Sequence, residues 1–250
     1  MADVAEIISY DPALTARLLK LVNSPFFGLV AKVDTITRAI NLLGTQQVHD
    51  LVLATAVIDS FSGFDNDCFN IYDFWFNGVY CAVTARLLAY YCQDLDTQRS
   101  FVGGLLHNLG HLIMYQKIPE EALRAAELAT EKNISLPISE REILSFDYAQ
   151  LGAELMREWK LPESLQEITE FHIEPEKSDR FKIETAIVHI ASAITQNALA
   201  QIPISEETLK VKPLCWELTG LSSDKMADIK TEVDQQAGAV MSILFKQKKS

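Results

Sequence analysis

The residues of this sequence best suited to chemistry are its histidines, because an imidazole can bind a metal ion or transfer a proton near neutral pH. In the apolar segment FVGGLLHNLGHLIMYQ, His107 stands beside Asn108, and His111 follows four residues later. A spacing of four predicts both rings on one face of a helix, as a zinc site requires. The Glu of an H-E-x-x-H hydrolase is missing, however, since Asn108 takes its place. Two interpretations stay open: a zinc pair, or a hydrogen-bonded interior His107 with a partly exposed His111.

The other three histidines each have a structural interpretation. His49 precedes Asp50 in a predicted helix and is expected to be exposed beside that carboxylate. His172 ends a helix, where a cation stabilises the helix dipole. His189 lies in an isoleucine-rich helix and is expected to be a hydrogen-bonded core histidine. The sequence contains no nucleophile elbow, no Ser/His/Asp order and no phosphate-binding loop.

Composition excludes several classes of partner and location. The chain has 22 Lys and Arg against 34 Asp and Glu, a formal net charge of -12, so its average surface repels a polyanion and nucleic acid is not an expected partner. No apolar run is long enough to span a membrane, and the N-terminal residues lack the basic-then-apolar order of a signal peptide. The cysteines form no CxxC pair and are expected to be free thiols in a reducing compartment, which predicts a cytoplasmic protein; they are Cys68, Cys81, Cys92 and Cys215.

The elements that must position these residues are predicted to be helices throughout, because almost every apolar pattern has the helical period. Asp11 and Pro12 are typical of a helix start, and further helices are predicted over 34–44 and 45–60. Ser139 and Glu142 have capping-box spacing and predict another helix start. The segment 71–91 is apolar on almost every side, which predicts a buried helix. The polar, glycine-containing stretch 61–67 is the expected boundary between two lobes.

Several segments resemble the HDOD domain, the HD-related output domain of bacterial signalling proteins. They occur in the expected order between about residues 5 and 200: IISYDPALTARLLKLVNSPFFG, ITRAINLLGTQQVHDLVLATAV, FWFNGVYCAVTARLLA, LLHNLGHLI and YAQLGAELMREWKLPESLQEITEFH. The resemblance implies an all-α, multi-helical HD-like bundle with an N-terminal helical lobe. It implies that lobe at 1–63, a degenerate HD-like lobe at 64–200 and a C-terminal helical extension at 201–250. It also suggests that a further helical segment precedes the stretch ADVAEII.

The same resemblance implies where a metal site would lie. HD phosphohydrolases bind metal through a His, an adjacent His-Asp pair and a later Asp, and the matching positions in this sequence are Asn77, His107 with Asn108, and Ser192. Of these, His107 alone keeps its type. Two further positions where related proteins often carry His are occupied by Tyr148 and by the pair Phe171 and His172.

These replacements remove the charge on which metal binding depends. Carboxylates offset the cost of dehydrating a divalent ion, and neither Asn nor Ser supplies that charge. We therefore expect no metal, no other cofactor and no catalysis. Asn77, His107, Asn108 and Ser192 are expected either to satisfy one another as a polar cluster or to line a retained cavity.

The function that follows is a non-catalytic signal-transduction module acting through contacts with a protein partner or a fused signalling domain. Two alternatives stay open. One is a phosphohydrolase with a site rebuilt from His107, His111, His172 or His189, and the other is a sensor whose cavity binds a nucleotide.

Overall fold

The computed structural model describes residues 2–27, 32–61, 69–92 and 95–245, and within those ranges it contains helices and no β-strand. The predicted all-α fold is confirmed. None of the helices described is both long enough and apolar enough to cross a membrane. The α-helices are α1 (Ala2–Ser9), α2 (Pro12–Val22), α3 (Ile36–Leu43), α4 (Thr45–Ser60), α5 (Ile71–Tyr91), α6 (Thr97–Leu106), α7 (Leu109–Lys117), α8 (Pro119–Lys132), α9 (Leu136–Leu144), α10 (Tyr148–Glu158), α11 (Glu163–Phe171), α12 (Lys182–Leu199), α13 (Pro213–Thr219) and α14 (Met226–Leu244). Short 3-10 helices lie at Pro25–Phe27, Pro175–Lys177 and Ser223–Lys225.

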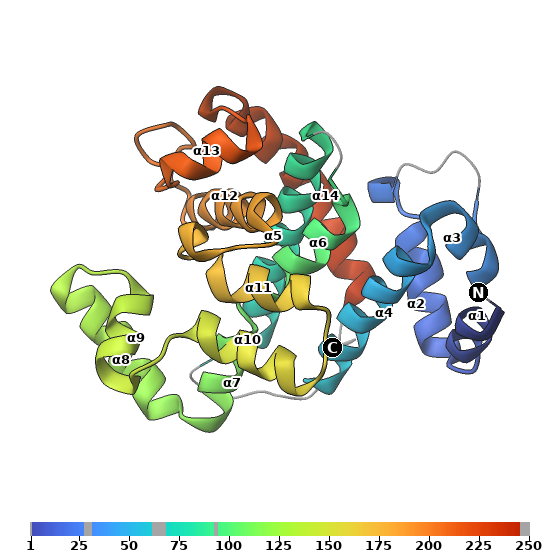
Figure 1. The fold of residues 1–250 in the computed structure, drawn as a ribbon, viewed down its shortest axis with the longest axis horizontal. Helices are drawn as coiled ribbons and strands as arrows, with labels where there is room; N and C mark the ends of the chain where they lie inside the picture. Colours follow the sequence, from blue (N-terminus) through green and yellow to red (C-terminus); the bar gives the residue numbers. More distant parts are fainter. Residues whose placement is uncertain (1, 28–31, 62–68, 93–94, 246–250) are drawn as a thin grey trace.

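Helix α5 forms the centre of the molecule, with α6, α12 and α14 packed around it (Figure 1). Val79, Cys81 and Leu88 are completely buried among these helices. Each fully buried Val or Leu contributes roughly 1.5–3 kcal/mol relative to an exposed one, which explains why this helix is apolar on almost every side. Tyr80 keeps a polar contact in the core, because its hydroxyl donates a hydrogen bond to Asp234 of α14 at 2.6 Å. The prediction of a buried central helix is confirmed.

Helices α1 to α4 form one end of the molecule (Figure 1). Helix α2 begins as predicted, because the Asp11 side chain accepts hydrogen bonds from two backbone N–H groups of the first turn and Pro12 follows it. Helix α14 packs against both α5 and α2, and one buried cluster contains residues from all three predicted segments. Most of the predicted boundary 61–67, together with Cys68, lies outside the described residues. The division of the chain into three parts therefore stays a prediction.

The helix is interrupted between α6 and α7, at His107 and Asn108. The prediction that His107 and His111 lie on one face of a single helix is therefore wrong. Gly110 in the first turn of α7 packs directly on α10, where a Cβ atom would lie 1.9 Å from the backbone oxygen of Tyr148. Only glycine permits so close an approach. This contact fixes the direction of α7 independently of α6.

Helices α8 and α9 pack against each other at one side of the molecule (Figure 1). Helix α9 begins at Leu136 with Pro137 in its first turn, a position that favours proline. Ser139 is completely buried within the helix, and its hydroxyl donates a hydrogen bond to the Leu136 carbonyl oxygen at 2.9 Å. The predicted helix start at Ser139 is therefore wrong.

Candidate functional site

The residues that the sequence singles out lie at two neighbouring hollows rather than in one cavity. The smaller hollow has a volume of about 350 Å³ and lies between the start of α5 and α7. The larger has a volume of about 820 Å³ and lies between α9 and α12. Asn77 and Asn108 line the smaller hollow, whereas Tyr148, His172 and Ser192 line the larger.

His107, Tyr148 and His172 form a buried cluster at the meeting of α6, α10 and α11. The two imidazole rings lie edge to face, with their centroids 5.0 Å apart. The Nδ1–H of His172 donates to the Thr169 carbonyl oxygen at 2.8 Å, so its Nε2 is the acceptor for the Tyr148 hydroxyl at 2.9 Å. The Nδ1–H of His107 donates to the Gly104 carbonyl oxygen at 2.7 Å. Backbone carbonyl groups therefore fix the tautomers of both rings.

Burial keeps this cluster uncharged. Burial is the main cause that lowers the pKa of His107 to about 4; the hydrogen bond to Gly104 opposes this shift and the neighbouring His111 adds to it. Burial, followed by the nearby His107, lowers the pKa of His172 well below its usual value. His172 caps the C-terminal end of α11, as predicted, with its backbone N–H donating to the Ile168 carbonyl oxygen. Its imidazole is neutral because of burial, so the predicted stabilisation of the helix dipole by a cation is wrong.

His111 stands at the edge of this cluster and contacts α9 and α10. Its ring stacks on Tyr148 with a centroid separation of 3.8 Å, and its Nε2 lies 3.0 Å from Oε1 of Glu140. The second oxygen of Glu140 accepts a hydrogen bond from the Tyr148 backbone N–H at 2.9 Å. Glu140 is almost fully buried and has both oxygens occupied, so it joins α9 to α7 and α10.

Ser192 does not meet Asn77 or Asn108. Its hydroxyl accepts a hydrogen bond from Gln196, one turn later on α12, at 3.3 Å. The amide of Asn108 instead faces Asn77, with 3.4 Å between Nδ2 and Oδ1. The prediction that these side chains satisfy one another is therefore wrong for Ser192 and for His107, which bonds to the Gly104 carbonyl oxygen. Asn77, Asn108 and Ser192 line two separate hollows instead.

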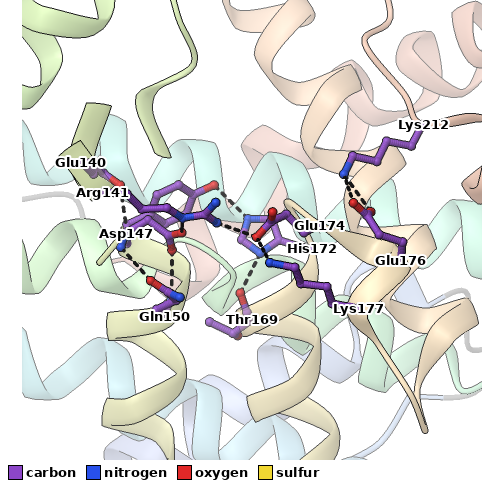
Figure 2. A network of polar contacts seen from close by, with 11 residues as sticks. Glu140, Arg141, Asp147, Gln150, Thr169, His172, Glu174, Glu176, Lys177 and Lys212 are labelled. Atoms are coloured by element: carbon purple, nitrogen blue, oxygen red, sulfur yellow. Dashed lines mark hydrogen bonds and ion pairs between the residues drawn. The ribbon is translucent and has the colours of Figure 1, made fainter. Parts of the chain in front are cut away.

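Charged side chains surround the larger hollow as alternating ion pairs, as Figure 2 shows. The guanidinium of Arg141 contacts Asp147 at 2.5 Å and Glu174 at 2.6 Å. Lys212 contacts both oxygens of Glu176 at 2.7 Å. Despite burial, hydrogen bonds from Arg141 and Lys177 lower the pKa of Glu174. These pairs neutralise Arg141 and Lys212, whereas Lys210, which also lines the hollow, forms no ion pair with a described residue.

The donor set does not fit the divalent ion that the HD resemblance implies. Within the described ranges, no three His, Cys, Asp or Glu side chains converge as metal ligands would. The lone pair on Nε2 of His172 accepts the Tyr148 hydroxyl, and Nε2 of His189 accepts the Lys212 backbone N–H at 3.1 Å. Nε2 of His111 directs its proton to a carboxylate. Nε2 of His107 and Nδ1 of His111 carry no hydrogen bond within the described part of the chain, but two neutral donors cannot replace a set of anionic ligands.

The remaining histidines agree with their predicted structural roles. The side chain of His49 is 47% exposed and lies 3.4 Å from Asp50. His189 is partly buried, and its Nδ1–H donates to the backbone oxygen of His172 at 2.7 Å. Both ring nitrogens of His189 are therefore hydrogen-bonded, as expected of a satisfied core histidine.

Two residues central to this region were not predicted. Glu140 and Arg141 belong to the segment SERE, whose spacing indicated a helix cap rather than partners for His111 and Asp147. The available signal was the helical period of α9, which places Glu140 on its apolar side. A carboxylate at such a position requires a buried partner.

Comparison with known proteins gives a family match and a structural match. A family model of the HDOD domain matches residues 1–175. A protein of Treponema pallidum (strain Nichols), described as uncharacterized, is 28% identical over 173 residues, which cover 69% of this chain and 33% of that protein. The chain thus spans about a third of the length of that relative.

Solved structures with the same fold come from several bacteria. A candidate phosphohydrolase from Shewanella amazonensis SB2B superimposes with a TM-score of 0.77 at 26% identity, covering 98% of this chain and 87% of that one. An HDOD domain protein from Geobacter sulfurreducens gives 0.74 at 22% identity, covering 98% and 87%. A candidate signal transduction protein from Marinobacter aquaeolei VT8 gives 0.74 at 19% identity, covering 98% and 54%. These last two likenesses concern the fold.

Proposed function

The chain belongs to the HDOD domain family, and we propose that it is a non-catalytic signalling module that acts through contact with a protein partner or a fused signalling domain. The observation that carries the proposal is that, among the described residues, no set of metal ligands converges at or beside the positions that match the HD metal site. His172 and His189 each have both ring nitrogens in hydrogen bonds within the fold, and the metal-ligand positions at Asn77, Asn108 and Ser192 carry no charge. Without a bound metal there is no activated hydroxide for phosphoester hydrolysis.

The surface supports a role in protein contact. Four tyrosines are more than half exposed: Tyr10, Tyr72, Tyr90 and Tyr91. Tyr90 and Tyr91 lie together at the end of α5, with ring centroids 5.7 Å apart. Exposed tyrosines are enriched where one protein binds another. Affinity capture from the native host with the wild-type chain and with a Tyr90→Ser, Tyr91→Ser double variant would identify a partner that depends on this pair.

An activity assay tests the absence of catalysis. The chain is incubated with manganese, magnesium or zinc and with a panel of phosphomonoesters and cyclic dinucleotides. We expect no turnover above that of buffer containing the same metal. Turnover that disappears on His107→Ala would overturn the proposal, because it would assign the surviving imidazole to a rebuilt phosphohydrolase site.

The larger hollow favours a second candidate, a sensor of a small molecule such as a nucleotide. Its volume of about 820 Å³ lies within the range of small-molecule sites, roughly 300–1,000 Å³. Thermal-shift screening against nucleotides tests this candidate, because a ligand at 100 times its dissociation constant adds about 2.7 kcal/mol of stability. The absence of a shift for every nucleotide would remove it.

A further inference from the structure

The smaller hollow is lined by a residue with an unsatisfied polar group, Asn108. This group has no role in the two functions proposed above. Asn108 is 7% exposed, and its Oδ1 is buried without a hydrogen-bond partner. Its Nδ2 contacts Asn77 Oδ1 at 3.4 Å, a long hydrogen bond. A buried acceptor left unpaired is unfavourable. Asn108 lines the hollow, and a small rotation of its amide would bring Oδ1, which is covered in this structure, within reach of a hydrogen-bond donor on a ligand.

The charge around the hollow favours a cationic donor. Among the described residues that line it, Asp73 carries a negative charge and none is Lys or Arg. Asp73 is exposed on the first turn of α5 and forms no ion pair within the described part of the chain. His111, on the inner side, contacts the Glu140 carboxylate at 3.0 Å. An anionic ligand would meet Asp73 with no Lys or Arg side chain in the lining to compensate its charge.

The N-terminus of α5 does not reverse this preference. Its dipole places partial positive charge near Asp73. The Asn70 side chain, however, accepts hydrogen bonds from the backbone N–H groups of Tyr72 and Asp73 at 2.9 and 3.2 Å. Those two donors are therefore already paired and are not available to an anion.

Aromatic rings complete the wall of the hollow. Phe69 stacks on Tyr115 with a centroid separation of 4.7 Å, and it lies 5.5 Å from Phe74. All three rings line the cavity. The negative face of an aromatic ring attracts organic cations, and apolar walls favour a ligand with a hydrocarbon part. A metal ion would gain little from three such rings, which distinguishes this site from the metal site of HD phosphohydrolases.

We propose that the smaller hollow binds a small organic cation that donates hydrogen bonds, such as a primary alkylammonium. The ammonium hydrogens pair with Asn108 Oδ1, the charge interacts with the Asp73 carboxylate, and the alkyl chain packs against Phe69, Phe74 and Tyr115. The cavity volume of about 350 Å³ suits a ligand at the small end of the usual range. This inference does not depend on the proposed partner contact, because it concerns a separate cavity of the isolated chain.

Three ligands of similar shape test the proposal: butylammonium, butyltrimethylammonium and butan-1-ol. Each is titrated into the labelled full chain, and the side-chain amide resonances of Asn108 are followed by NMR. We expect saturable shifts with butylammonium, with a dissociation constant on the order of 1 mM. Butyltrimethylammonium has the charge but no N–H donor, and butan-1-ol has a donor but no charge, so both are expected to bind about tenfold more weakly.

Matched variants separate this site from general attraction to an acidic protein. Asp73→Asn is expected to weaken butylammonium binding about two- to fivefold, since the charge interaction is with an exposed carboxylate. Asp228→Asn is the control, because Asp228 is also exposed in the first turn of a helix, α14, and does not line the hollow. Its affinity is expected to equal that of the wild type.

Three results would overturn the proposal. The first is equal binding of butan-1-ol and butylammonium, and the second is an Asp73→Asn variant with wild-type affinity. The third is saturation of the same Asn108 resonances by Mg²⁺ or Ca²⁺ in the absence of a response to butylammonium. A folded spectrum of Asp73→Asn, compared with wild type, confirms that a loss of binding is not a loss of structure.

Discussion

Acidification from pH 7.5 to pH 5 should destabilise this protein through His107. The pKa of His107 is about 4 in the folded chain, chiefly because of burial, against an ordinary value of 6.5 that applies to the unfolded chain. A histidine whose folded pKa is depressed stays neutral in the fold while the same histidine in the unfolded chain takes up a proton. For a histidine this stability is fully present above about pH 6.5 and is lost progressively as the pH falls toward 4.

The size of the effect follows from those two pKa values. At pH 5 the unfolded histidine is almost fully protonated, whereas the folded one is largely neutral. The linkage relation then gives a loss of about 2 kcal/mol in the free energy of unfolding between pH 7.5 and pH 5. The depressed pKa of His172 acts in the same direction. The carboxylates with lowered pKa, such as Glu167 and Glu174, lose their contribution mainly below this range.

Urea unfolding at pH 7.5 and pH 5 measures this loss in the free energy of unfolding for the wild type, His107→Gln and His49→Gln. The His107→Gln variant is expected to be less stable than the wild type at pH 7.5, but its loss on acidification should be smaller by about 2 kcal/mol. His49→Gln is the control, because His49 is exposed, and its pH dependence should match the wild type. If His107→Gln loses as much stability as the wild type, the buried neutral state of His107 is refuted.

Packing and hydrogen bonding give two further predictions. Gly110→Ala should lower the free energy of unfolding by about 3 kcal/mol or more, because its Cβ would lie 1.9 Å from the Tyr148 backbone oxygen. In the control Gly238→Ala, the new Cβ has no atom within 4 Å, so the variant should be neutral or more stable by up to about 1 kcal/mol. Thermal unfolding of both variants measures the difference. In urea unfolding, Tyr148→Phe should lower the free energy of unfolding by about 1–2 kcal/mol, because it removes the donor to His172 Nε2. The control Tyr72→Phe should match the wild type, because Tyr72 is exposed. Equal stability of both variants would contradict the assigned hydrogen bond.

The helical elements could be predicted from the sequence because their signals are local. Asp11 and Pro12 mark the start of α2, and the buried central helix α5 shows its position by being apolar on almost every side. The start of α9 was misplaced, because Ser139 has the spacing of a cap but lies buried within the helix. A local sequence pattern cannot reveal that the Ser139 side chain is buried in the folded chain.

The arrangement of the site could be predicted only in part, because it depends on contacts between helices distant in sequence. Resemblance to the HDOD family identified the positions at Asn77, His107 and Asn108, which do lie close to the buried cluster. Spacing alone suggested one helix through His107 and His111, but the approach of α7 to α10 at Gly110 breaks it. The partner of His111, Glu140, lies 29 residues later in the chain, and no spacing rule connects them.

Metal content tests most directly whether the positions that resemble the HD metal site hold an ion. The full chain, purified without added metal, is analysed by elemental mass spectrometry and then titrated with Mn²⁺, Mg²⁺ and Zn²⁺, alongside the His107→Ala variant. We predict far less than one ion per chain and no saturable binding at these positions, with no difference between the two proteins. About one tightly bound ion per chain in the wild type, lost in His107→Ala, would contradict a non-catalytic module.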